Sequence, residues 1–217
     1  MMVKRSVLQV DIYSDVICPW CFIGKRRLQA ALEEVGPAQP VHVRWRPFEL
    51  NPTMPKGGMD RRSYLEAKLG GAASLQTMED RLIHAGRLDG VDFAFDRIAR
   101  IPNTFDAHRV IWFAGQKGCQ DDIVEALFYA YFTDGCDIGN HDSLAGIAAD
   151  CGMSRETVLE FLTRDQAAHE VRAEEAVGHR LGIRGVPYFL LNGRLSVSGA
   201  QPPDVLVSAI RQVGALG

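Results

Sequence analysis

The chain has 217 residues, of which 47% are hydrophobic and 24% are charged. These proportions are ordinary for a globular protein, and the length suits one large domain or a domain with a sizeable insertion. The net charge is −3 and no long basic run is present, which argues against nucleic-acid binding. No stretch is long enough to span a membrane, and the apolar segment after Met1 to Arg5 is too short for a secretion signal. We therefore expect a cytoplasmic protein without a membrane partner.

The first elements form a strand, a helix and a second strand. Residues 7–13 alternate between apolar and polar side chains, which predicts a β-strand. Apolar residues then recur with helical spacing from Pro19 to Val35, and Gly36-Pro37 ends this helix. Residues 41–48 predict the second strand. A crossover helix of this length implies that the two strands are parallel.

A pair of cysteines, Cys18-Pro19-Trp20-Cys21, lies where the first strand meets the helix. Cys18 is the predicted N-cap and Pro19 the first helical residue, where its missing N–H costs nothing. The free backbone N–H groups and the positive end of the helix dipole favour a thiolate at Cys18, which is the nucleophile of thiol–disulfide exchange. Cys21, one turn later, is expected to be buried and to act as the resolving thiol.

The alternative for this cysteine pair is half of a structural zinc site. Such a site needs a second pair of ligands, and the chain has no other CxxC, HxxxH or CxxH motif. The remaining cysteines, Cys119, Cys136 and Cys151, are expected to pack as small apolar residues. A second disulfide among these three is the minority hypothesis. We therefore predict redox chemistry at the pair and no metal site.

A long helical block follows the second strand. Residues 51–60 contain prolines and glycines and predict a loop. Almost no β-rich run occurs between residues 61 and 181, apart from a short segment at residues 91–94. We expect an insertion at residues 59–181 within a discontinuous domain of residues 1–58 and 182–217. The predicted helices cover residues 63–69, 75–85, 104–117, 121–133, 143–151 and 154–181.

The chain returns to β-structure after Pro187. Two apolar runs flank Asn192-Gly193, which is a strong signal for a two-residue hairpin turn. A last helix is predicted from Pro203 to Val213. The carboxyl-terminal part of the chain therefore adds a β-hairpin and a helix to the first sheet.

Four motifs in this order resemble the DsbA family of thioredoxin-fold proteins, and more closely its FrnE-like branch. They are SDVICPWCFIGKRR in residues 14–27, PNTFDAHR in residues 102–109, GVPYFLLNG in residues 185–193 and SGAQP in residues 198–202. The resemblance spans most of the chain. It implies an α/β protein with a thioredoxin-like fold, in which a central mixed sheet is flanked by helices and carries a large all-helical insertion.

The resemblance also implies site residues outside the cysteine pair. In the family, the proline at the position of Pro187 is cis and faces the dithiol, and the residue before it, here Val186, offers its backbone to a bound substrate. The expected substrate-contacting residues are Pro19, Trp20, Val186, Asn103, Thr104 and His108. For His108, a purely structural helix histidine is the equal alternative. The other histidines (42, 84, 141, 169 and 179) have no carboxylate or cysteine at a suggestive spacing and are expected to lie on the surface or to pack.

The proton acceptor for Cys21 is less clearly predicted. Related enzymes often carry a buried carboxylate six residues before the first cysteine, and this position is Ile12 here. Asp15, three residues before Cys18, is the candidate for proton transfer. The alternatives are that Asp15 only caps the turn and that water carries the proton.

These observations predict a protein thiol–disulfide oxidoreductase whose direction, reduction, isomerisation or oxidation, depends on its redox poise. No cofactor is expected besides the redox-active dithiol, with glutathione or another thiol as the reductant. The expected partner is a protein or small molecule that contains a disulfide or thiol, and the chain is expected to be a monomer or a homodimer. The main alternative is a glutathione-dependent transferase or isomerase of the kappa-class or hydroxychromene-carboxylate isomerase type. A peptide-binding module with incidental cysteines is the third hypothesis.

Overall fold

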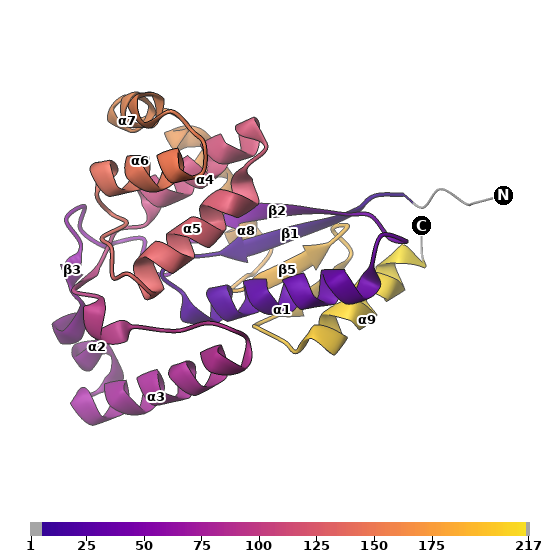
Figure 1. The fold of residues 1–217 in the computed structure, drawn as a ribbon, viewed down its shortest axis with the longest axis horizontal. Helices are drawn as coiled ribbons and strands as arrows, with labels where there is room; N and C mark the ends of the chain where they lie inside the picture. Colours follow the sequence, from indigo (N-terminus) through magenta and orange to yellow (C-terminus); the bar gives the residue numbers. More distant parts are fainter. Residues whose placement is uncertain (1–5, 216–217) are drawn as a thin grey trace.

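The computed structural model describes residues 6–215 and contains a four-stranded sheet with helices on both faces (Figure 1). Residues 1–5 and 216–217, the ends of the predicted discontinuous domain, lie outside the described part. The strand order is β2-β1-β5-β6, with β1 parallel to β2 and antiparallel to β5, and β5 antiparallel to β6. The strands are β1 (Leu8–Ser14), β2 (Val41–Pro47), β5 (Tyr188–Leu191) and β6 (Leu195–Ser198).

Two helices cover one face of this sheet. Helix α1 (Pro19–Val35) packs against α9 (Pro203–Gly214), and both contribute side chains to the core over β1. Adjacent strand residues point to opposite faces, so Ile12 faces this core while Tyr13 faces the other side. On that other side, Gly178 of α8 (Ala168–Arg180) lies against the Tyr13 ring. The predicted mixed sheet flanked by helices is confirmed.

The helical block differs from the prediction at two places. The helix predicted over residues 154–181 is divided into α7 (Arg155–Thr163) and α8, with left-handed backbone at Asp165 and Ala167 between them. A two-stranded ribbon of β3 (Met59–Asp60) and β4 (Arg100–Ile101) was not predicted, because two-residue strands show no periodicity. The other helices are α2 (Arg61–Leu69), α3 (Ala72–Leu88), the 3-10 turn η1 (Phe95–Arg97), α4 (Phe105–Lys117), α5 (Gln120–Phe132) and α6 (His141–Asp150).

The helical block and the sheet share a hydrophobic core. Phe22 of α1 stacks on Phe128 of α5 with ring centroids 5.1 Å apart, and it meets Phe93 edge to face at 6.3 Å. Trp45 of β2 also contacts the Phe128 ring at 6.4 Å. Side chains on the two sides of the predicted domain boundaries, at residues 58 and 182, therefore share one core. The positions of these boundaries stay a prediction.

The outer edge of β2 is closed by a side chain. Gln120, at the start of α5, accepts a hydrogen bond from the Trp45 backbone N–H at 2.9 Å and donates to the Trp45 carbonyl at 3.2 Å. The Gln120 amide thus makes the two bonds that the peptide group of a neighbouring strand would make. No helix within residues 6–215 is both long enough and apolar enough to cross a membrane.

Candidate active site

The two cysteines lie at the start of α1 as free thiols. Cys18 is the N-cap residue with extended backbone, Pro19 is the first helical residue, and the Cys18 N–H donates to the Asp15 carbonyl at 3.0 Å. Cys21 is completely buried, whereas Cys18 is 5% exposed and Trp20 between them is 42% exposed. The predicted placement of the pair is confirmed, with Cys18 nearer to solvent.

The Val186-Pro187 turn forms the opposite wall of the site. The Val186–Pro187 peptide bond is cis, and the Cys18 thiol donates to the Val186 carbonyl with 3.6 Å between sulfur and oxygen. Gly24 of α1 permits this approach, since a Cβ at residue 24 would lie 2.8 Å from Cγ of Pro187. Residues 168 positions apart in the chain are thus held in contact.

Burial keeps the Cys21 thiol protonated. Burial and the neighbouring Cys18 raise the pKa of Cys21 well above its usual value, although the Ser14 hydroxyl and the Asp15 backbone act in the opposite direction. A thiolate is the species that attacks a disulfide. Cys21 therefore needs a proton acceptor when it reacts.

Asp15, three residues before Cys18, and His108 are buried ionisable groups that face each other. Asp15 is fully buried, and its Oδ2 accepts a 2.7 Å hydrogen bond from the Leu50 N–H. Its Oδ1 lies 3.5 Å from His108 Nε2. Burial alone lowers the pKa of His108, but Asp15, Glu49 and Glu175 together raise it above its usual value. His108 therefore lies in the interior against Asp15 and not on a cleft wall. The Asp15 carboxylate binds the loop that follows β2, at Leu50, and does not cap its own turn.

Two buried glutamates, Glu49 and Glu175, are in contact with each other, and their charges act on His108. Glu175 of α8 accepts a hydrogen bond from the Glu49 N–H at 2.7 Å. Burial, followed by the Glu175 charge, raises the pKa of Glu49 to about 7, although His108 opposes the shift. Neither residue could be predicted from the sequence, because they are 126 positions apart and share no motif.

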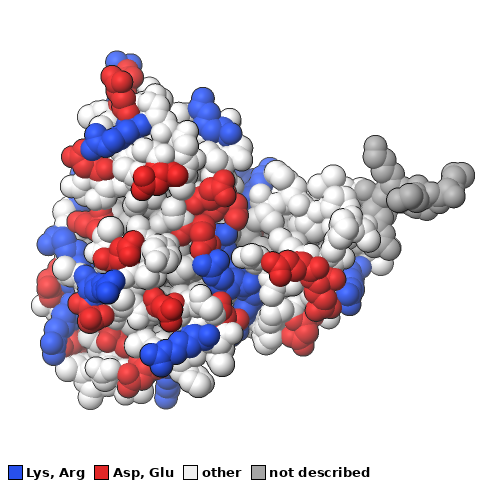
Figure 2. All heavy atoms as spheres, viewed as in Figure 1, with Lys and Arg blue, Asp and Glu red and all other residues white. Residues whose placement is uncertain are grey.

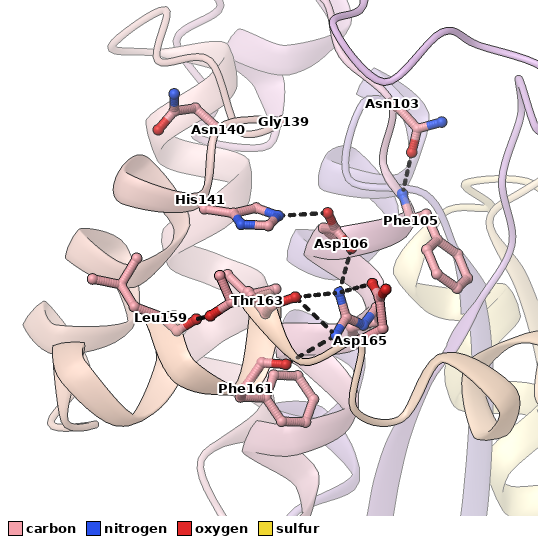
Figure 3. A network of polar contacts seen from close by, with 12 residues as sticks. Asn103, Phe105, Asp106, Gly139, Asn140, His141, Leu159, Phe161, Thr163 and Asp165 are labelled. Atoms are coloured by element: carbon pink, nitrogen blue, oxygen red, sulfur yellow. Dashed lines mark hydrogen bonds and ion pairs between the residues drawn. The ribbon is translucent and has the colours of Figure 1, made fainter.

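Asn103 and Thr104 lie at the start of α4. Asn103 donates through Nδ2 to the Met54 carbonyl at 2.7 Å and accepts from the Phe105 N–H at 3.0 Å, a bond drawn in Figure 3. Thr104 is buried at the helix N-cap. Asn103 therefore joins the loop after β2 to α4. A cavity of about 400 Å³ opens beside this junction and is lined by residues that include Glu49, Lys56, Asn103, Phe105, Arg172 and Glu175.

A second polar network joins α4 to α6 and α7. Asp106 accepts bonds from His141 Nε2 at 2.7 Å and from the Arg109 guanidinium at 2.6 Å (Figure 3). His141 was expected to lie on the surface or to pack, and its carboxylate partner comes from a helix 35 residues earlier, which is not a suggestive spacing in the sequence. His179 likewise lies 3.9 Å from Glu175. Arg109 is fully buried and binds the carbonyl groups of Phe161, Leu162 and Gln166.

The charged surface is mixed in sign. Figure 2 shows acidic and basic side chains interspersed over one face of the molecule. The basic residues just after the cysteines are paired: Lys25 with Asp121 at 2.8 Å, and Arg27 with Asp89 at 2.9 Å. Within residues 6–215, no group of three or more His, Cys, Asp or Glu side chains could hold a metal ion, so the zinc alternative lacks its second ligand pair there.

The mixed sheet, the CxxC pair and the Val-Pro turn define a thioredoxin-like protein. The family model described as "DSBA-like thioredoxin domain" matches residues 9–211, and the chain belongs to this family. The uncharacterized protein YwbO of Bacillus subtilis is 30% identical over 204 residues, which cover 94% of this chain and 96% of that protein. The DsbA resemblance is confirmed, and the FrnE-like branch stays a prediction.

Solved structures agree with this assignment. A probable DsbA oxidoreductase from Streptomyces coelicolor is 32% identical and has a TM-score of 0.88, covering 96% of this chain and 90% of that one. The cytosolic disulfide reductase DsbM from Pseudomonas aeruginosa shares the fold at 21% identity and a TM-score of 0.68, covering 96% and 100% of the two chains. A 2-hydroxychromene-2-carboxylate isomerase also shares it, at 18% identity and 0.72, covering 96% and 99%.

Proposed function

We propose that this protein is a thiol–disulfide oxidoreductase in which Cys18 is the nucleophile and Cys21 the resolving thiol. The observation that carries the proposal is the position of Cys18 at the N-terminus of α1, directly against the Val186 carbonyl. The free N–H groups of the first helical turn stabilise a thiolate there. The buried Cys21 lies one helical turn behind, within reach of Cys18.

In the reductive direction, the Cys18 thiolate attacks one sulfur of a substrate disulfide, and the other sulfur leaves as a thiolate. The Cys21 thiolate then attacks the Cys18 sulfur of this mixed disulfide. The Cys18–Cys21 bond forms, the bond between Cys18 and the substrate breaks, and the second substrate thiol leaves. Two electrons pass from the dithiol to the substrate, and a thiol such as glutathione returns the protein to its reduced state.

The substrate is proposed to be a disulfide-containing protein or small molecule bound across the dithiol. Trp20 offers an exposed ring beside Cys18, and the Val186 backbone offers polar groups from the opposite wall. Pro19 and Pro187 complete the surface around the sulfur. Asn103 and Thr104 are proposed to contact the substrate, and Asn103 holds the loop after β2 through the Met54 carbonyl.

The cytoplasm is the proposed location, and a reducing role suits it. The fold shared with a protein whose name is "cytosolic disulfide reductase" supports this location. The chain is proposed to act as a monomer or a homodimer. Disulfide reductase activity is the direction that a reducing compartment favours.

The test is reduction of the disulfides of a model protein by the wild type, Cys18→Ser and Cys21→Ser. Cys18→Ser should abolish turnover, because the attacking sulfur is lost. Cys21→Ser should accumulate mixed disulfides at Cys18 that survive on a non-reducing gel. Unchanged activity of both variants would contradict the proposal, and glutathione conjugation that survives Cys21→Ser would favour the transferase or isomerase alternative.

A further inference from the structure

We propose that Arg27 and Asp89 are positioning residues for the Val186-Pro187 turn, and that they determine how tightly a disulfide-containing protein binds across the dithiol. The inference deepens the proposed function and rests on it. Both residues act through the segment that follows β6, residues 199–201, and neither has to touch the substrate. The inference gives a role to two sequence motifs that the proposed reaction leaves unused: the basic run after the cysteines and SGAQP.

The first contact joins the Val186-Pro187 turn to residues 199–201. The Gly199 N–H donates to the Pro187 carbonyl at 2.8 Å, which continues the pairing of β5 with β6 by one residue. The backbone of Gly199 has a φ of 79°, a left-handed conformation that favours glycine and turns the chain away from the strand. The position of the Pro187 carbonyl therefore depends on where residues 199–201 are held.

Arg27 of α1 binds this segment at its second residue. Nη1 of Arg27 donates to the Ala200 carbonyl at 2.5 Å. The Arg27 side chain is only 18% exposed, so this charge-assisted bond is largely shielded from water. Gly24, one turn earlier on the same side of the helix, lies against Pro187 itself. Helix α1 therefore contacts both the turn and the segment that holds it.

Asp89, at the carboxyl end of α3, fixes the orientation of the guanidinium. Its Oδ2 atom lies 2.9 Å from both Nε and Nη2 of Arg27. The carboxylate thus occupies one edge of the planar guanidinium, and Nη1, which lies away from that edge, is directed at Ala200. A residue of the helical block therefore holds the arginine on which the substrate-binding turn depends.

Arg26, the neighbour of Arg27, makes no such contact. Its guanidinium pairs with Glu125 of α5 and lies 5.1 Å from the centroid of the Phe22 ring. Within the described part of the chain it has no hydrogen bond to residues 199–201. Both arginines are partly buried and pair with a carboxylate of the helical block. Arg26→Gln therefore removes the same charge without touching the turn, and it is the matched control.

The turn matters more for a protein substrate than for a small disulfide. A polypeptide bound across the dithiol contacts the Val186 backbone as well as the Cys18 sulfur, which lie 3.6 Å apart. A small aromatic disulfide needs only the Cys18 thiolate, and α1 itself stabilises this thiolate. Loss of the Arg27 contact should therefore weaken the binding of a protein substrate and leave the reactivity of Cys18 unchanged.

Reduction of insulin and of dithiobis(nitrobenzoate) separates these two effects. Insulin is reduced with saturating dithiothreitol as the electron source. The small disulfide is reacted with protein that carries Cys119→Ala, Cys136→Ala and Cys151→Ala, so that only the dithiol responds. Arg27→Gln should raise KM for insulin about tenfold with kcat unchanged within about twofold, because it removes binding shared by the ground and transition states. Its rate with dithiobis(nitrobenzoate) should equal that of the protein with Arg27 intact.

Two further variants distinguish positioning from stability. Arg27→Lys keeps the charge but not the planar group, so it can bind Asp89 or Ala200 but not both. It should recover part of the lost stability and still raise KM for insulin. Asp89→Asn should raise KM as well. The double variant with Arg27→Gln should show no larger KM than Arg27→Gln alone, because both residues act through one contact.

Arg26→Gln should change neither the KM for insulin nor the rate with dithiobis(nitrobenzoate). The same KM in Arg27→Gln and Arg26→Gln would overturn the inference, as would an equal loss of activity with both substrates. Either result leaves the proposed function intact, since the wild type still reduces insulin through Cys18. Insulin reduction by the wild type that does not depend on Cys18 would instead contradict the proposed function. If Arg27→Gln does not fold, Arg27→Lys and Asp89→Asn decide by the same comparison.

Discussion

Gly24 shows how a missing side chain positions the reactive sulfur. A helix interior normally disfavours glycine, since alanine in the same place restricts the unfolded chain more. Here the hydrogen atom in place of a Cβ lets Pro187 pack directly on α1. The contact between Cys18 and Val186 therefore depends on a residue that carries no chemistry.

Gly24→Ala should push Pro187 away from α1 and cost about 1 to 3 kcal/mol of stability, as overpacked sites do. Disulfide reductase activity should fall with it, because the Val186 carbonyl leaves the Cys18 sulfur. Chemical denaturation and initial rates measure the two effects. Gly146→Ala is the control: nothing lies within 4 Å of a Cβ at this helical position, so stability should rise slightly. Equal behaviour of the two variants would count against the positioning role.

At the scale of single residues, the sequence predicted the roles of the cysteines and Pro187 because their motifs are local. The partners of Asp15 were not visible. His108 follows it by 93 positions and Glu49 by 34, and only tertiary packing buries them together. An isolated glutamate in a chain with 27 acidic residues gives no signal of burial.

At the scale of elements, Arg109 binds the carboxyl end of α7 and the connection to α8. Its guanidinium binds the carbonyl groups of Phe161 and Leu162, which also accept the backbone N–H groups of Gln166 and Asp165 beyond the end of the helix. It also binds the Gln166 carbonyl in the connection to α8. The helical periodicity across residues 154–181 could not reveal this break, because the side chain that binds the connection lies on α4.

Arg109→Ala should destabilise the protein by about 3 to 5 kcal/mol, the usual result of breaking a buried ion pair by removing one partner. Hydrogen exchange should also increase most in the connection between α7 and α8. Arg155→Ala is the control, since it removes an exposed pair with Asp142 and should cost at most about 1 kcal/mol. Similar losses for both variants would show that the buried network does not hold this connection.

At the scale of the whole molecule, one aromatic cluster joins the helical block to the sheet. Phe22 directly follows the second cysteine, and it contacts the rings of Phe93 and Phe128, which lie on the other side of the predicted boundary. The sequence predicted that the block is inserted, because β-structure flanks it. The sequence did not predict that the two parts share a core, since periodicity shows which face of a helix is apolar and not what covers it.

Phe22→Ala should cost about 3 to 5 kcal/mol and should lower the stability of both parts together. Unfolding followed by far-ultraviolet circular dichroism and by tryptophan fluorescence should give one coincident transition in the wild type and the variant. Leu88→Ala, at an exposed position, should leave the midpoint nearly unchanged. Two separate transitions in the wild type would show that the parts unfold independently.

The Gln120 amide at the rim of β2 has a consequence for how the protein behaves at high concentration. An open strand rim invites the backbone of another copy to add to the sheet, and growth by such additions leads to aggregation. Gln120 already occupies both backbone groups of Trp45, midway along the strand. An incoming chain would have to displace the Gln120 side chain before it could pair with the Trp45 backbone. This neutral side chain therefore protects the edge of β2 from pairing with another copy at that residue.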